Sequence, residues 1–439
     1  MTTAPSCSIS SYNAPAVRAP RNWSVGFWRG LICCAMFSVV FVPEFSRDGT
    51  GSTGSFLYVK VATGFRFIDL AICILVLGHI VALGCSRVKT IHFPRTLLFP
   101  GLAFLGCVGI AIAYGSMHGG SNFFFDWRGL ALGIGLCFVW SFWMQKPCDI
   151  DIVVRLFAVY MAARLALLYL LFIAGYRDTL AGVSIPIFDG PALSCIVFTG
   201  LLAFRHQQST DNRIQKLLWC GLATAAYVMV LLCFRRTYWG ELAVGTVILL
   251  LLRRRHRLRN AAFLGAALCV AAGVLGSSFS RRMQSFDVTS ADNEFNVDNS
   301  DHLLDLADAW DQVRQSPVMG IGLGTSYPTW RIKKWKTESV MVHNAPLHVW
   351  LKYGLAGLVC YLWFHLALLR WLFRRSKSQE FDNTFSSVAF AYLTAQFATT
   401  LTFAPWPYSE LQLTILISFI LAAVMGRGTV MKRSFDLAL

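Results

Sequence analysis

A short polar segment, MVHNAPLH at residues 341–348, closes the long polar interval of this chain and leads directly into an apolar run. Asn344 can cap the first turn of the following helix, and Pro346 fits that turn because an early helical position needs no amide donor. His343 then lies just outside a helix N-terminus, where free amides and the helix dipole favour bound anions and a neutral imidazole. These residues predict a general base beside an anion site. The alternative is a polar cap where a membrane helix meets water.

Hydrophobic helices must position this segment. The chain has 439 residues, of which 56% are hydrophobic and 14% charged, and its mean hydropathy is +0.54. Such a composition excludes a soluble domain of this length. Because every backbone polar group needs an internal partner in lipid, we expect an all-α polytopic membrane protein. About twelve segments reach the ~20 residues that a span requires, at 25–42, 62–84, 96–114, 123–143, 152–175, 187–204, 217–234, 238–252, 261–279, 345–369, 386–403 and 411–425.

The formal charge of +16 does not indicate nucleic-acid binding, because the basic residues form short clusters between apolar segments. The connecting loops alternate in charge, and the loops with the basic clusters fall on the same side as the N-terminus. The positive-inside rule makes that side cytoplasmic. We predict a disordered cytoplasmic tail at 1–24, a transmembrane bundle at 25–427 and a cytoplasmic C-terminal tail at 428–439. The long interval at 280–342 is a large non-cytoplasmic loop within the bundle.

The loop at 280–342 contains a predicted helix between Ser300, as its N-cap, and Pro317. Its apolar face, which predicts packing on the bundle, holds Leu303, Ala307, Trp310 and either Val313 or Arg314. A GIGLG turn at 320–324 follows, in which glycine serves either phosphate binding or turn geometry alone. A last stretch of alternating cations and tryptophans suits an acceptor or anionic headgroup surface, or a plain interfacial anchor. Its residues are Trp330, Arg331, Lys333, Lys334, Trp335 and Lys336.

Several ionisable residues fall in the third of the membrane nearest this loop. Charges so deep are costly in lipid and usually face a cavity or a partner, so they predict a polar, mostly cationic cleft open to the outer face. For a single arginine the alternative is snorkelling or a local pair. The residues are Arg66, Asp69, Asp126, Arg128, Glu241 and Lys352, with Arg235 and Arg236 between two spans and Arg281 and Arg282 at the start of the loop.

The adjacent Arg235 and Arg236 fit a pyrophosphate clamp, because guanidinium groups match phosphate oxygens in geometry and charge. Arg164 lies in the middle of the fifth predicted span and must face protein, water or substrate. The sequence has no Walker motif, no nucleotide-binding GxGxxG, no HExxH and no DxD in a non-cytoplasmic loop. Its 13 cysteines contain no CxxC pair, which excludes a typical zinc site. We therefore expect no nucleotide, no metal and no other cofactor.

His343 and Asn344, followed by Leu347, Gly354 and Gly357, resemble the HNxxLxxxxxxGxxG signature of bacterial O-antigen ligases and their polymerase relatives. The PVMGIGLG run at 317–324 and the FRRTY turn at 234–238 are similar to segments of the same family, with Arg236 at the family arginine. The resemblance covers roughly residues 217–369, and elsewhere it extends only to hydropathy.

Two positions depart from the family pattern. Arg235 stands where the family usually has a small residue, which leaves open whether Arg235 or Arg236 contacts substrate. The helix of the loop often begins with arginine in this family, but here it begins with Asp301 and His302. That difference gives more weight to Arg281 or Arg282 as the phosphate ligand of the loop.

The resemblance implies a GT-C-like bundle of about twelve helices that works at the periplasmic face of the bacterial inner membrane, among membrane lipids. An O-antigen chain on undecaprenyl pyrophosphate would move to lipid A-core, with inversion and without a metal. His343 would take the proton of the acceptor hydroxyl. Arg236 and Arg282, helped by Arg235 and Arg281, would hold the diphosphate. The remaining substrate-binding candidates are Asn344, Arg66, Arg128 and Arg164.

Three other functions compete with this one. An O-antigen polymerase uses the same donor, but neither Arg177 nor the pair Arg281 and Arg282 has glycine at the Rx10G spacing common in polymerases, which favours the ligase. A related ligase could instead glycosylate tyrosine or serine in proteins. A multi-span transporter or lipid flippase is the alternative from another class. The gathering of charges at one face and the lack of an internal repeat count against a transporter.

Overall fold

The structure is a computed structural model that describes most of the helical part of the chain. For some residues in the described ranges, among them Arg66, Asp69 and Arg236, the structure describes the backbone but not the side chain. The ranges are 60–62, 65–85, 94–120, 123–144, 147–175, 177–180, 183–186, 190–233, 235–252, 265, 296–329, 338–339, 342–377, 383–401 and 411–436.

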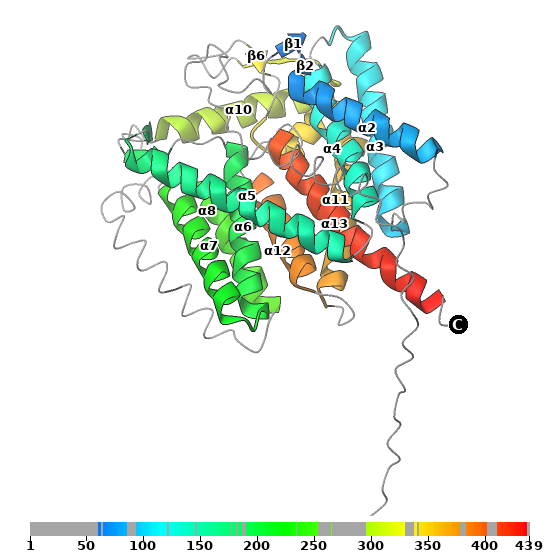
Figure 1. The fold of residues 1–439 in the computed structure, drawn as a ribbon. Helices are drawn as coiled ribbons and strands as arrows, with labels where there is room; N and C mark the ends of the chain where they lie inside the picture. Colours follow the sequence, from blue (N-terminus) through cyan, green and yellow to red (C-terminus); the bar gives the residue numbers. More distant parts are fainter. Residues whose placement is uncertain are drawn as a thin grey trace, which may run out of the picture.

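Helices make up nearly all of the described chain (Figure 1). Three short antiparallel hairpins accompany them: β1 (Lys60–Ala62) with β2 (Phe65–Arg66), β3 (Arg177–Leu180) with β4 (Val183–Pro186), and β5 (Tyr327–Pro328) with β6 (Glu338–Ser339). The helices are α2 (Phe67–Cys85), α3 (Arg95–Met117), α4 (Phe123–Trp143), α5 (Pro147–Ile173), α6 (Gly190–Ser209), α7 (Arg213–Leu232), α8 (Arg236–Leu252), α10 (Asn296–Gln315), α11 (Ala345–Lys377), α12 (Asn383–Thr400) and α13 (Leu411–Asp436).

Four helical segments of the described chain are long and apolar enough to cross a membrane: Arg95–Met117, Ile150–Ile173, Arg213–Leu232 and Ala345–Lys377. Shorter apolar helices run over Arg128–Ser141, Thr237–Leu252 and Leu413–Met425. The protein is thus an all-helical, polytopic integral membrane protein. The number of about twelve spans stays a prediction. The span expected at 25–42 lies outside the described ranges, and so does the span expected at 261–279 except for residue 265.

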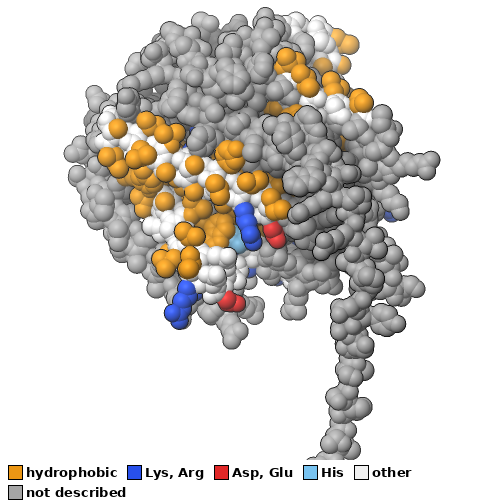
Figure 2. Space-filling view, in the orientation of Figure 1, with side chains coloured by type: hydrophobic (Ala, Val, Ile, Leu, Met, Phe, Trp, Pro, Cys, Tyr) orange, Lys and Arg blue, Asp and Glu red, His pale blue; other side chains and the backbone are white. Residues whose placement is uncertain are grey.

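The outer surface of the helices is strongly apolar. Figure 2 shows hydrophobic side chains spread over the described part of one face, with few charged side chains among them. Large apolar side chains are 62–74% exposed on α2, α3, α5 and α7, namely Leu77, Phe99, Val159, Leu170 and Leu217. A surface of this kind is typical of helices that face lipid.

Inside the bundle, a group of buried aromatic rings joins helices that are distant in sequence. Phe198 of α6 packs edge to face on Tyr392 of α12, with ring centroids 5.2 Å apart, and on Phe157 of α5 at 5.7 Å. Phe419 of α13 lies 5.6 Å from Phe157 and 5.5 Å from Trp140 of α4. Because such pairs have preferred geometries, they fix α12 and α13 relative to the rest of the bundle.

Helix α10 differs from its prediction in two respects. It begins at Asn296, so Ser300 lies inside the helix and does not cap it. Several earlier residues are equally good capping types, so residue type alone does not locate the start. Val313 is buried as predicted, together with Ala309, whereas Trp310 is 38% exposed and packs edge to face on Trp350 of α11. The buried side of the helix also carries Asp305, a residue that hydrophobic periodicity assigns to water.

Candidate active site

The start of α11 has the predicted cap. The backbone N–H of Leu347 donates to Asn344 Oδ1 at 2.9 Å, which confirms Asn344 as the N-cap. The amide nitrogen Nδ2 of Asn344 also donates to the carbonyl oxygen of Leu401, just beyond the end of α12, at 2.8 Å. The backbone before α11 is therefore fixed on both sides, and His343 lies immediately before this cap.

His343 has a carboxylate partner from another element. Its Nδ1 lies 3.4 Å from Oδ2 of Asp305 on α10. The His343 side chain is 37% exposed, whereas that of Asp305 is 7% exposed. The other carboxylate oxygen of Asp305 accepts a hydrogen bond of 2.6 Å from the Tyr327 hydroxyl. An accessible imidazole beside a buried carboxylate can accept a proton at Nε2.

The sequence does not single out Asp305. The signal that could have found it is the set of aspartates of this helix, Asp301, Asp305, Asp308 and Asp311, which recur at helical spacing in a segment expected to pack on the bundle. A carboxylate on the packed face needs a partner, and His343 and Tyr327 supply one for Asp305.

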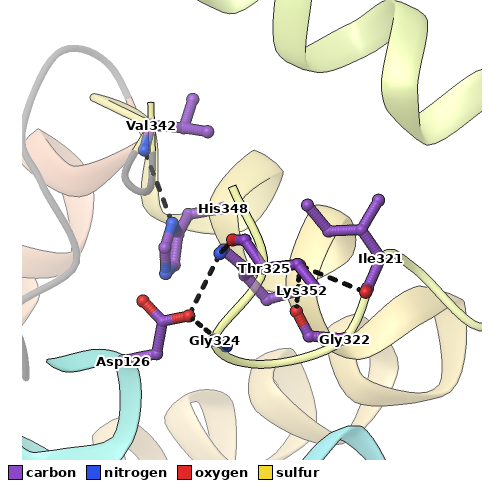
Figure 3. A network of polar contacts seen from close by, with 8 residues as sticks. All are labelled: Asp126, Ile321, Gly322, Gly324, Thr325, Val342, His348 and Lys352. Carbon is purple, nitrogen blue, oxygen red and sulfur yellow. Dashed lines mark hydrogen bonds and ion pairs between the residues drawn. The ribbon is translucent and has the colours of Figure 1, made fainter. Parts of the chain in front are cut away.

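A buried ion pair lies in the N-terminal part of α11, about two helical turns after its start (Figure 3). Lys352 Nζ is 3.0 Å from Asp126 Oδ2, and the same oxygen accepts the backbone N–H of Gly324 at 2.9 Å. Lys352 also donates to the carbonyl oxygen of Thr325. The predicted proximity of Asp126 and Lys352 is thus confirmed, but the two form a buried ion pair that links α4, α11 and the glycine-rich turn, and they do not line an open cationic cleft.

His348 supports the residue that precedes His343. Its Nδ1 faces the backbone N–H of Val342 at 3.4 Å, and the ring is almost completely buried (Figure 3). His348 and Lys352 are one turn apart on α11 and point to the same polar network. This contact therefore holds the backbone on the N-terminal side of His343 by means of a buried residue.

The glycine-rich turn at 320–324 has a structural role. Gly320, Gly322 and Gly324 have φ of +70°, +84° and +82°, which side chains with a Cβ rarely adopt. The backbone N–H of Ile321 donates to Leu351 and that of Leu323 donates to Ala111, at 2.7 and 2.9 Å. Since the amide of Gly324 binds Asp126, these amides are engaged within the protein, which supports the geometric alternative over phosphate binding.

Helix α11 is interrupted where the turn meets it. Gly354 has φ +71° and ψ −175° inside the helix, a conformation almost restricted to glycine. The backbone N–H of Leu355 donates to Val318 at 3.1 Å, and a Cβ on Gly354 would overlap the carbonyl of Val318. The first glycine of the signature after His343 therefore lets the turn dock into α11.

The arginine turn and His343 lie near the same end of α12. Helix α7 ends at Leu232 and α8 begins at Arg236, so Arg235 lies in the tight connection, with its side chain exposed. A Cβ built on Gly240 of α8 would be 3.8 Å from Cγ2 of Thr399, two residues before the Leu401 that binds Asn344. Of Arg236, the structure describes only the backbone.

Two further charged residues, one expected in the cleft and one in the middle of a span, are buried inside the protein. Glu241 is 1% exposed and accepts hydrogen bonds from Ser194 Oγ at 3.0 and 3.1 Å, so it does not line an open cleft. Arg164 is 1% exposed on α5, which packs on α6, α7, α13 and β4. It faces protein, as its charge requires. Arg128, on α4, is partly buried.

The remaining predicted site residues are not placed. Arg66 is described only by its backbone in β2. Across the described ranges, no group of three or more His, Cys, Asp and Glu side chains has a metal-binding arrangement. The predicted residues outside the described ranges are Arg281, Arg282, Trp330, Arg331, Lys333, Lys334, Trp335 and Lys336.

One comparison with known proteins matches the segment that carries most of these residues. Residues 220–362 match the family described as O-antigen ligase. No curated protein matches the chain. The matched segment contains the arginine turn, α10, the glycine-rich turn, His343 with its cap and both glycines of the signature. The match over this segment supports an O-antigen ligase and polymerase family member.

Proposed function

We propose that this protein is an O-antigen ligase, which moves an O-antigen glycan from undecaprenyl pyrophosphate to lipid A-core at the periplasmic face of the bacterial inner membrane. Its family supports an enzyme of O-antigen processing with lipid-linked glycan substrates. The observation that carries the proposal is His343, an accessible base with a carboxylate partner, next to a helix start that the arginine turn approaches.

In this proposal His343 Nε2 takes the proton of the acceptor hydroxyl while the hydroxyl oxygen attacks the anomeric carbon of the donor. A bond forms between that oxygen and the anomeric carbon, and the bond from the carbon to pyrophosphate oxygen breaks. The electron pair leaves with undecaprenyl diphosphate. A single displacement of this kind inverts the anomeric centre.

Fixed cations take the part that a metal plays in other transferases. Arg236 and Arg282, helped by Arg235 and Arg281, stabilise the charge that develops on the diphosphate. The exposed side chain of Arg235 at the start of α8 supports this assignment. Arg66, Arg128 and Asn344 extend the substrate-binding surface, and residues 330–336 form the acceptor or headgroup surface.

The test is a transfer assay with purified protein, undecaprenyl-pyrophosphate-linked glycan and lipid A-core, with EDTA and without nucleotide. We expect ligated product from the wild type and a loss of at least ~100-fold for His343→Ala and for Arg236→Ala. Arg213→Ala and His206→Ala are matched controls at the opposite, cytoplasmic end of the bundle and should retain transfer.

Each other result points to a different function. Lengthening of the donor glycan would identify a polymerase. Donor that accumulates on the cytoplasmic side when His343 or Arg236 is replaced would identify a transporter. A folded His343→Ala protein that transfers glycan at the wild-type rate would exclude the proposed base.

A further inference from the structure

We infer that Asp305 is a positioning residue for His343, which holds the imidazole with its proton on Nδ1, so that the unprotonated Nε2 can accept the proton of the acceptor. The inference rests on the proposed role of His343 as the base and adds a residue from α10 to that site. Its starting point is the distance of 3.4 Å between Asp305 Oδ2 and His343 Nδ1.

The carboxylate of Asp305 has a fixed orientation. Tyr327 donates its hydroxyl to Oδ1 at 2.6 Å, and the Tyr327 side chain is itself buried. Because one oxygen is anchored by this short hydrogen bond, the other oxygen is directed toward His343. The two oxygens thus have separate partners, as in sites where a carboxylate orients a histidine.

Packing around this contact is independent of the two side chains. Ala309 and Val313 of α10 form a small buried cluster with Tyr327, Val342 and Leu351. This cluster holds α10, β5 and the residues before α11 together. Since the backbone is fixed by apolar contacts, the carboxylate is not required to hold the helix in place, and an orienting role explains its burial.

The neighbouring charges have other partners. Lys352 pairs with Asp126 at 3.0 Å, and Nδ1 of His348 faces the amide of Val342. The distance from Asp305 to His343 is long for a hydrogen bond, but pairs of this kind commonly shorten when substrate binds. The exposure of His343, 37% against 7% for Asp305, leaves its ring open to such a substrate.

Replacement of Asp305 by asparagine tests the tautomer directly. The side chain keeps its size, and its oxygen can still accept the Tyr327 hydroxyl. Its amide group, however, donates to Nδ1, which makes Nδ1 an acceptor and moves the imidazole proton to Nε2. A histidine in that tautomer cannot accept a proton at Nε2.

The experiment measures steady-state transfer from undecaprenyl-pyrophosphate-linked glycan to lipid A-core. For Asp305→Asn we expect kcat to fall about 100-fold and the KM for donor to stay within about twofold. Asp305→Glu should recover part of the loss, because a carboxylate is restored. Asp311→Asn, on the same helix, is the matched control and should retain wild-type kcat.

A double variant separates orientation from structure. If Asp305 acts through His343, Asp305→Asn combined with His343→Ala should be no slower than His343→Ala alone. A further loss as large as that of Asp305→Asn alone would overturn the inference, and so would wild-type kcat in a folded Asp305→Asn protein.

Failure of the proposed function has a different signature. A fully active His343→Ala protein would contradict both the role of His343 as the base and the role of Asp305 as its positioning residue. An inactive His343→Ala protein together with a fully active Asp305→Asn protein would contradict only the inference about Asp305. If Asp305→Asn does not fold, the Tyr327→Phe variant tests the inference instead, because it keeps the Asp305 carboxylate and removes only the hydrogen bond from the Tyr327 hydroxyl that orients it. We expect about a tenfold lower kcat with unchanged KM, and unchanged kcat would overturn the inference.

Discussion

Asn344 makes two hydrogen bonds with separate purposes. Its oxygen caps α11 through Leu347, and its nitrogen binds the Leu401 carbonyl beyond α12. The cap fixes the direction of the first helical turn. The second bond fixes the distance between the His343 backbone and the end of α12, which also approaches α8. At the residue scale, Asn344 thus joins the base to the neighbourhood of the arginine turn.

Two substitutions of Asn344 distinguish these bonds. Asn344→Ser keeps a side-chain oxygen that can cap the helix but does not reach Leu401, whereas Asn344→Ala removes both bonds. We expect the alanine variant to be less stable than the serine variant by about 1 kcal/mol, the usual value of an N-cap. Thermal unfolding of the detergent-solubilised variants measures this difference, and equal unfolding midpoints would contradict the cap.

At the element scale, the interruption of α11 is a docking site for the glycine-rich turn. The turn enters at Gly354, where the helix cannot continue its hydrogen bonds, and it is tied to α3 through Ala111 and to α4 through Asp126. Lys352 comes from the helical turn before the break. The glycines and the buried ion pair therefore act together, and they fix the position of the N-terminal part of α11, which follows His343, relative to α3 and α4.

Gly354→Ala should disrupt this docking. The positive φ alone costs about 1–3 kcal/mol for a residue with a Cβ, and overlap with the Val318 carbonyl adds to it. We expect a lower thermal midpoint and loss of monodisperse protein in gel filtration. Gly109→Ala on α3 is the matched control, since its Cβ would meet no atom within 4 Å, and it should leave the midpoint unchanged or slightly raised. Equal midpoints for the two variants would contradict the docking role.

On the scale of the whole molecule, the described contacts gather the site at one end of the bundle. The C-terminal parts of α3 and α12 meet the N-terminal parts of α4, α8 and α11 there. In Figure 1, α10 and the strands β1, β2 and β6 lie toward the same end. This arrangement agrees with antiparallel helices whose ends on one side of the bundle all contribute to one site.

Labelling of single introduced cysteines tests which end is periplasmic. Val318→Cys, at a position 64% exposed before the glycine-rich turn, should react with a membrane-impermeant maleimide added to spheroplasts. Asp211→Cys, exposed between α6 and α7, should react only after the membrane is permeabilised. The unsubstituted protein gives the background from its 13 cysteines. The opposite pattern would invert the topology and place the proposed site in the cytoplasm.

The sequence by itself determined the class of the protein and the character of its site. Hydropathy is a local property, so it identifies membrane helices without knowledge of their partners. The cap at Asn344, the tight arginine turn and the positional need for glycine are also local, because they depend on residues close together in the chain. The approach of Asp126 to Lys352 followed from topology, since both were expected near the outer face.

Only the tertiary structure decided which residues complete the site. Asp305 looks like a solvent-exposed helix residue in the sequence, and it becomes a partner of His343 because α10 is rotated to bury it against β5 and α11. Glu241, expected in the cleft, is instead buried with Ser194. Such contacts join segments far apart in the chain, and periodicity within one segment carries no information about the face that another segment presents.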